Sequence, residues 1–422
     1  MLSNGYVDNY SDKNIDNLME AVVRRLEEHI KYNSMVCVED FIKDNFNIER
    51  FDMNEIINEF KEGKCKAVKN PFKCHEVKNK SYIANSTIEI KEISTVESFV
   101  SYIGNVPLTV KVIEENEKAK QCQKISKRQK KEQMTITFAD VAEKAEEMFY
   151  RGHANVNFEL IPSLFREKIW EENESKMYHN LISRFPEKFD NKKRHLDILQ
   201  EMQHYSLPTR LLDVTQNPLV ALYFAISESA ESDGEVIIFH ANKEILKNAY
   251  SDSVELLCAL AALPNEIQRK LFHDVESFKN LNNDKSVIKE FSGKESVNKL
   301  LHQIRQKVGN FEPVINPKDL KGMRFVTPQL SNARIIRQNG SFIVAGLFGN
   351  GEDRKFSLIK EYDKHRVKYG TGQIRYIIPS ICKEKILNQL NMLGINESTI
   401  YPEIDHVANY IKNNIKYTHN EM

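Results

Sequence analysis

Five side chains that can do polar chemistry fall close together in the middle of this 422-residue chain. They are His204, Tyr205, Thr209, Arg210 and Asp213. Imidazole can carry a proton near neutral pH, and a guanidinium can hold a phosphate or carboxylate by paired hydrogen bonds. The cluster therefore predicts a substrate-binding site on a loop, with His204 as a catalytic group. A structural alternative stays open, in which Arg210 pairs with Asp213 and locks the loop.

Two helices are expected to flank this loop. Leu196, Leu199 and Met202 recur at helical spacing and predict a helix over residues 194–204. Pro208 then turns the chain. The pair Asn217-Pro218 predicts the start of the next helix, since asparagine accepts the first amide protons and proline suits the first helical turn. We therefore expect the polar stretch in a helix-to-helix connection.

The second helix and the segment after it are expected to pack tightly. Ala221 and Ala225 would let a neighbouring element approach the helix closely, while Tyr223 lies on its apolar face. Residues 234–239 read as a buried strand.

A further arginine lies in the aromatic sequence Phe149-Tyr150-Arg151-Gly152. The residues before it, 139–148, favour a helix that ends at this point, and the aromatic sequence favours a strand. Arg151 is then a catalytic candidate that could bind a phosphate, a ribose edge or a carboxylate, with Tyr150 and Gly152 beside the ligand. The structural alternative pairs Arg151 with Asp213 or Glu159.

Residues 334–344 read as a strand, a tight Asn-Gly turn and a second strand. Arg334 would lie on the first strand as a binding residue, and Gln338 at the edge of the turn as a third catalytic candidate. Residues 376–379 predict another strand, followed by a helix at 385–390. The fold class that follows is α+β, with a small, mainly antiparallel sheet flanked by helices.

Four of these segments stand in the order that is typical of the FRG-domain family, which takes its name from an aromatic-Arg-Gly motif. They are residues 149–153, 160–164, 203–225 and 334–342. The chain resembles this family over roughly residues 90–415, although Ser206 and Val214 stand where the pattern leads us to expect Gly and Trp. The resemblance implies an FRG domain over residues 91–422. It also implies an accessory bacterial role, such as an effector in phage defence or a toxin.

The order of polar residues also resembles the layout of ADP-ribosyltransferases, which use NAD. By this analogy Arg151 would bind the pyrophosphate, Tyr223 or Tyr205 would stack on the base, Gln338 would orient the ribose, and His204 would carry the proton. Gln338 departs from the pattern because an amide lacks the negative charge of the usual late glutamate. The alternative is a non-catalytic module that binds a nucleotide, a nucleic acid or a protein partner.

Composition limits the other options. The 60 basic and 60 acidic side chains cancel, so the whole chain offers no electrostatic case for nucleic acid or membrane. The six cysteines are scattered, and their spacing predicts neither a metal site nor a disulfide framework. The N-terminal residues lack a signal-peptide core, and no long apolar run occurs, so we expect a cytoplasmic protein that does not enter a membrane.

Two regions fall outside these motifs. Residues 1–90 are expected to form a separate, mainly helical unit that preceded the FRG domain, with a stripe at Leu18, Val22 and Leu26. A lysine-rich insertion at about residues 105–135 contains the basic run Lys118 to Lys131. This run could contact the phosphates of a nucleic acid, or it could be a solvated segment, which the lack of interleaved aromatic residues favours.

Overall fold

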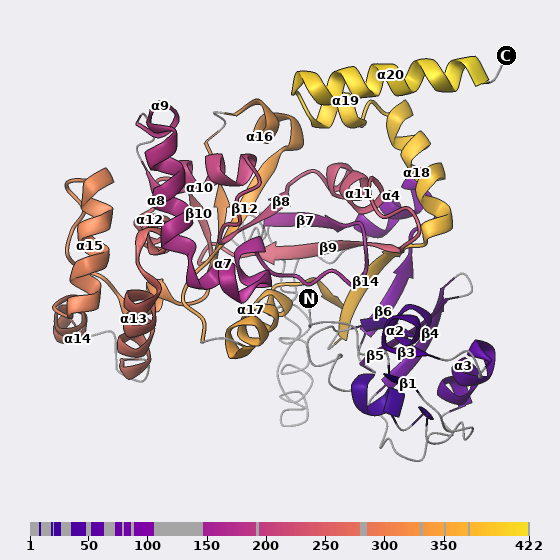
Figure 1. Cartoon of the computed structure of the whole chain (residues 1–422), viewed down its shortest axis with the longest axis horizontal. Helices are drawn as coiled ribbons and strands as arrows, with labels where there is room; N and C mark the ends of the chain where they lie inside the picture. The colour runs from indigo at the N-terminus through magenta and orange to yellow at the C-terminus, as the bar shows by residue number, and fades with distance from the viewer. Residues whose placement is uncertain are drawn as a thin grey trace, which may run out of the picture. The chain divides into compact units, whose positions relative to one another are not determined.

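The computed structural model describes the chain in fourteen stretches: residues 8–9, 18–19, 21–26, 35–47, 52–62, 72–77, 80–85, 88–104, 147–190, 194–278, 285–329, 332–349, 352–369 and 372–420. They divide into two compact units (Figure 1). Unit 1 contains Leu160–Gln216 and Lys243–His365, and unit 2 contains Leu2–Glu159, Asn217–Asn242 and Arg366–Met422. The basic run Lys118 to Lys131 and the insertion at 105–135 lie outside the described residues.

Unit 1 has a sheet of strands in the order β10 (Leu246–Asn248), β11 (Met323–Thr327), β12 (Gly340–Ala345) and β8 (Leu211–Thr215). The β10–β11 pair is parallel, and the other two pairs are antiparallel. Its helical elements are η1 (Ser163–Arg166), α7 (Lys168–Glu172), α8 (Glu174–Arg184), α9 (Pro186–Phe189), α10 (His195–His204), α12 (Asp252–Ala259), η2 (Leu260–Ala262), α13 (Asn265–Ser277), α14 (Lys285–Ser292), α15 (Glu295–Lys307), η3 (Pro317–Leu320), α16 (Ala333–Gln338) and α17 (Glu352–Lys364).

The core of unit 1 is built from α10, α12, α13 and α15 together with the inward side chains of the sheet. The predicted helix at 194–204 is confirmed as α10, and Leu196, Leu199 and Met202 are all buried in this core. Hydrophobic burial on this scale accounts for the stability of the unit and fixes the ends of β8, where the polar stretch begins.

Unit 2 contains a second set of strands. β7 (Glu147–His153) pairs antiparallel with β9 (Gly234–Ala241), and β9 pairs antiparallel with β14 (Gly372–Ile378). β14 also pairs with β13 (Lys368–Tyr369) and, in parallel, with β6 (Ile88–Glu92). The helices of this part are α4 (Val96–Gly104), α11 (Pro218–Ile226), α18 (Ser380–Met392), α19 (Glu397–Ile400) and α20 (Ile404–Asn420).

The described residues between Asp8 and Ile90 belong to unit 2 and include helix and strand. Residues 18–19 and 21–26 are helical, and α2 (Val38–Asn45) and α3 (Met53–Glu62) follow them. β1 (Asp8–Asn9) pairs with β3 (Phe46–Asn47), and an antiparallel sheet has the order β2 (Met35–Cys37), β5 (Lys80–Asn85), β4 (Phe72–Val77).

The α+β class is confirmed, with helices alongside both sets of strands. The prediction of a small sheet was wrong, because unit 1 contains four of the strands and unit 2 contains five more around β14. Two of the pairings, β10–β11 and β6–β14, are parallel, so the sheet architecture is mixed. No described helix combines the length and apolar character that crossing a membrane requires.

Three local predictions were wrong. Residues 334–338 form helix α16 in place of a strand, with Asn332 capping its start and Asn339 ending it at φ 45°. The sequence predicts a helix up to residue 148, but the strand β7 begins at Glu147. Residues 211–215, expected in a loop, form the buried strand β8. An Asn-Gly pair suits a helix C-terminus as well as a hairpin turn, because asparagine tolerates the left-handed conformation in both.

α11 lies directly on the strands of unit 2, as its alanines predict. A Cβ atom added at Gly152 would come within 2.6 Å of the backbone nitrogen of Ala225 and closer still to the carbonyl oxygen of Ala221. At Gly234 on β9, an added Cβ would collide with the Ala225 carbonyl oxygen. The two glycines therefore allow backbone-to-backbone packing of helix on sheet.

Substituting Gly152→Ala is expected to destabilise unit 2, because the added methyl group meets helix backbone that cannot move aside. We expect a loss of roughly 1–3 kcal/mol or more in the free energy of unfolding, measured by urea denaturation. Gly104→Ala is the control, since nothing lies within 4 Å of a Cβ at that position. Equal stability of the two variants would contradict the close packing of α11 on β7.

Candidate functional site

The strands of unit 2 carry charged side chains on the face opposite to α11. Strand register places His153 of β7 directly across from Glu235 of β9, and Arg151 across from Ile237. Because side chains alternate along a strand, Arg151 and His153 share one face, while Tyr150 and Gly152 share the other. We call the set Arg151, His153, Glu235, Arg366 and Arg375 the basic face.

Glu235 is the centre of the buried part of this face. Arg375 donates from Nε to its Oε1 at 2.6 Å and from Nη2 to its Oε2. Arg366 donates from Nη1 to Oε1 at 3.3 Å. All three side chains are buried, so the paired hydrogen bonds offset the cost of removing their charges from water.

Positive and negative side chains share this face. Arg151, Arg366 and Arg375 contribute three guanidinium groups, and Glu235 contributes one carboxylate. Glu92 shares the face by register with Ile377, and Glu147 shares it with Arg151 along β7, so three carboxylates accompany the three guanidinium groups.

Arg151 is half-buried, whereas His153 beside it is buried. The Arg151 Nε donates to the His153 Nε2 at 3.0 Å. An arginine can only donate, so the Nε2 of His153 is the acceptor and the imidazole is neutral. This hydrogen bond orients the guanidinium plane.

Three predicted binding residues of unit 2 do not accompany Arg151. Tyr150 of β7 and Tyr223 of α11 are buried in one apolar core, and burial raises the pKa of both phenols. Gly152 faces the α11 backbone. All three residues take part in the packing of α11 on β7, and their contact with a ligand stays a prediction.

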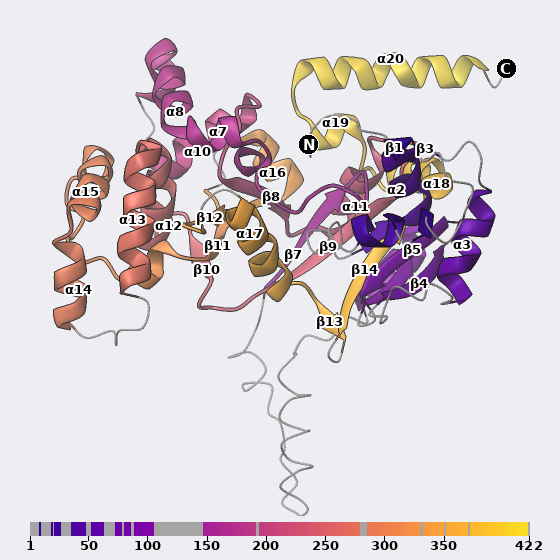
Figure 2. The same ribbon diagram turned by 60° about the horizontal axis from the view of Figure 1, so that its bottom comes forward.

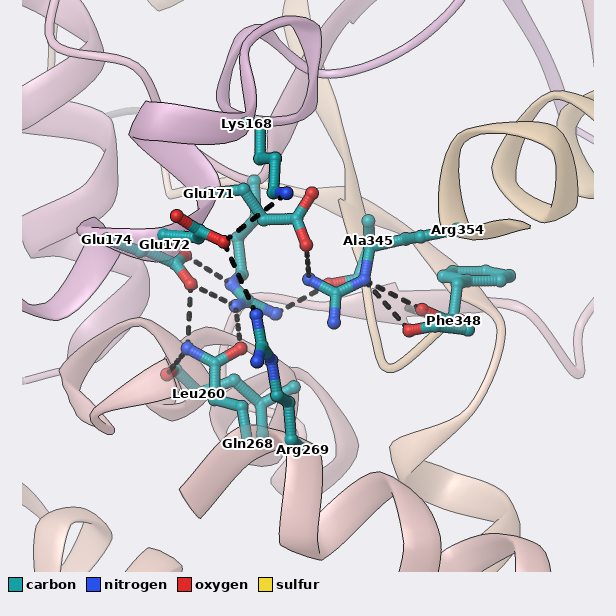
Figure 3. A network of polar contacts seen from close by, with 12 residues as sticks. Lys168, Glu171, Glu172, Glu174, Leu260, Gln268, Arg269, Ala345, Phe348 and Arg354 are labelled. Carbon is teal, nitrogen blue, oxygen red and sulfur yellow. Dashed lines mark hydrogen bonds and ion pairs between the residues drawn. The ribbon is translucent and has the colours of Figure 1, made fainter. Parts of the chain in front are cut away.

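In unit 1, Arg210 is a buried structural residue, with 1% of its surface exposed. Its Nε donates to the Glu174 Oε1 at 2.8 Å, and its Nη1 donates to the carbonyl oxygen of Ala345 at 3.1 Å. Gln268 accepts a further bond from the same guanidinium at 3.2 Å (Figure 3). The predicted Arg210–Asp213 pair was wrong, since the arginine turns inward from the start of β8 to meet α8 and α13.

A second arginine extends this network. Arg354 of α17 pairs with Glu171 at 2.7 Å and donates to the carbonyl oxygen of Phe348 (Figure 3). Burial lowers the pKa of Arg354 and raises that of Glu171, and each charge opposes the shift in the other. The network ties α7, α8, α13 and α17 together inside unit 1.

Asp213 points the other way and is exposed. Its Oδ2 accepts from the Gln203 Nε2 at 2.7 Å, and the Gln203 Oε1 accepts from the Thr209 Oγ1 at 2.6 Å. Ser163 donates from its hydroxyl toward the Thr209 carbonyl and accepts from the Thr209 amide. The buried Thr209 thus orients Gln203, which in turn orients an exposed carboxylate.

The other predicted residues of unit 1 lie around the ends of α10 and α16. His204 is half-buried and meets the exposed Tyr205 edge-to-face at 5.0 Å. Ser206 has φ 61°, a conformation that glycine adopts without strain, which explains why glycine is expected there. Gln338 ends α16, and the Thr215 hydroxyl donates to its backbone oxygen at 2.7 Å. Arg334, in the first turn of α16, is half-buried.

The structure thus brings Thr209 and Asp213 into one hydrogen-bonded array through Gln203, and it places Arg151 in unit 2. Among the residues that the structure describes, no group of three or more His, Cys, Asp or Glu side chains is arranged to hold a metal ion.

Residues 146–234 match the family model of the FRG domain. The chain carries an FRG domain. The match includes β7 with Arg151, the network residues Glu174 and Arg210, and α11 up to the first residue of β9. Neither a curated protein nor a solved structure gives a significant match to the chain.

The sequence analysis did not identify several buried charged residues in and around the FRG domain. Glu235 stands in an apolar strand, and Lys383 of α18 is buried with its ammonium donating to the carbonyl oxygens of Ala154, Glu228 and Ser229. His195 is buried against Glu255, with 2.6 Å between Nδ1 and Oε1. A lone charged residue in an apolar segment signals a buried partner, but it does not identify that partner.

Glu174→Gln tests the network that anchors Arg210. The substitution keeps the shape of the side chain but leaves the buried guanidinium without its counter-charge. We expect a loss of about 3–5 kcal/mol in the free energy of unfolding, measured by urea denaturation.

Glu172→Gln is the matched control, because Glu172 ends the preceding helix α7 and pairs with Arg269 at 3.4 Å where both side chains are partly exposed. Its expected loss is below about 1 kcal/mol. Comparable losses in the two variants would count against a structural role for the buried pair.

Proposed function

We propose that this FRG-domain protein binds a nucleotide through its phosphates, with Arg151 as the principal contact. The observation that carries the proposal is the orientation of the half-buried Arg151 guanidinium by the buried His153. Phosphate is the ligand group that best matches a held guanidinium, because its oxygens accept paired hydrogen bonds.

NAD is the first nucleotide to test. Its pyrophosphate offers the anion that Arg151 needs, and the order of motif residues resembles that of ADP-ribosyltransferases. An NAD-consuming reaction in the cytoplasm would deplete a shared cofactor, which would account for a role in bacterial defence or toxicity.

The second candidate is nucleotide binding without catalysis, and the side chain of Gln338 favours it. The residue ends α16 two residues before strand β12, where the analogy would place a glutamate. An amide there also lacks the charge that stabilises an oxocarbenium-like transition state. Binding of nucleic acid through the basic run Lys118 to Lys131 is a separate proposal, tested by adding single-stranded oligonucleotides to the same titrations.

Isothermal titration of the full chain with NAD, ADP and orthophosphate tests the binding proposal. We expect Arg151→Ala to weaken binding at least tenfold, since a charge-assisted hydrogen bond contributes roughly 1.5–3 kcal/mol. Lys385→Ala removes a positive charge from an exposed position of α18 and should leave binding unchanged. Binding that is equal in the wild type and Arg151→Ala would rule out the basic face as the site.

Mass spectrometry of NAD incubated with the same proteins separates catalysis from binding. Nicotinamide release by the wild type that is lost in Arg151→Ala would establish an NAD-consuming enzyme that depends on this arginine. Binding without any nicotinamide release would select the non-catalytic alternative.

A further inference from the structure

Helix α20 presents an apolar stripe to solvent. The stripe consists of Ile404, Ala408, Ile411 and Ile415, which follow one another at intervals of four, three and four residues. All four are exposed, and the three isoleucines expose 84%, 54% and 57% of their surface. Alternating intervals of three and four keep side chains on one line of a helix and are the pattern of helix-to-helix seams.

The opposite side of α20 is fixed to the rest of unit 2. His406 stacks on Tyr401 at 4.4 Å, and its Nδ1 lies 3.1 Å from the Glu397 Oε1. The Tyr410 hydroxyl donates to the Asn391 Oδ1 at 2.7 Å. With 3.6 residues per turn, His406 and Tyr410 lie on the side of the helix away from the stripe. α20 is therefore held against α19 and the end of α18 (Figures 1 and 2). Its apolar stripe is exposed on the other side.

The charges beside the stripe indicate which partner fits it. Asp405 and Lys412 are both exposed and flank the same edge of the stripe, one near each end. A second α20 running in the opposite direction would place its Lys412 beside Asp405, and the two-fold symmetry would repeat that pairing at the other end. The seam is thus complementary to itself in charge as well as in shape.

We propose that α20 is a self-association helix, which joins two copies of this chain as an antiparallel pair. The isoleucines and Ala408 form the shared seam, and two Asp405–Lys412 pairs set its direction. Burial of exposed isoleucine drives the association, and opposite charge at the edges selects the antiparallel arrangement over the parallel one.

Sedimentation velocity of the full chain over a range of concentrations tests this proposal. We expect a concentration-dependent dimer for the wild type and for the control Ile381→Asp, whose side chain is 79% exposed on α18 away from the stripe. Ile411→Asp should be monomeric under the same conditions. A wild-type chain that stays monomeric, or a dimer that survives Ile411→Asp, would overturn the proposal.

Charge reversal tests the antiparallel direction without relying on a destabilising change. Asp405→Lys alone and Lys412→Asp alone each place like charges together at both ends, so each should weaken the dimer at least tenfold. The double variant Asp405→Lys/Lys412→Asp restores opposite charges and should regain the wild-type dimer. Failure of the double variant to recover would reject the antiparallel pair.

Discussion

The close contact between α11 and the strands β7 and β9 is the constraint on which the rest of unit 2 depends. Gly152 and Gly234 lack the side chains that would hold the helix away, so the helix backbone covers one face of the strands. The alternation of a strand then sends Arg151 to the other face. The aromatic-Arg-Gly sequence therefore has two structural effects. Its glycine allows α11 to pack closely on one face of β7, and its arginine lies on the opposite face.

The two arginines of the FRG domain show how differently one residue type is used. Arg210 is enclosed by Glu174, Gln268 and a backbone carbonyl, so its charge serves to fix the positions of helices inside unit 1. Arg151 is half-buried, and its Nε donates to the neutral ring of His153, so an uncharged neighbour orients this guanidinium. The two arginines therefore differ in burial and in the neighbour to which the Nε donates.

Periodic segments of the sequence gave reliable expectations. α10, α11, β9, β14 and α18 lie where hydrophobic spacing and the Asn-Pro start signal place them, because these patterns report which side of an element is buried. Residues 334–338 were misread, since the Asn-Gly pair that ends α16 is equally suited to a hairpin. β8 was missed because a polar residue interrupts it, and the exposed Asp213 gave the segment the composition of a loop.

The sequence by itself determined the class of the fold, several of its regular elements and the FRG motifs, because spacing, capping residues and turn residues act over a few positions. It also selected Arg151 and Arg210 as unusual. Only the tertiary structure decided that Arg210 is buried against Glu174, that Tyr150 and Tyr223 are core residues, and that Glu235 is the buried counter-charge of Arg366 and Arg375. These outcomes depend on contacts between residues far apart in the chain, where burial and charge pairing are properties of the assembled fold.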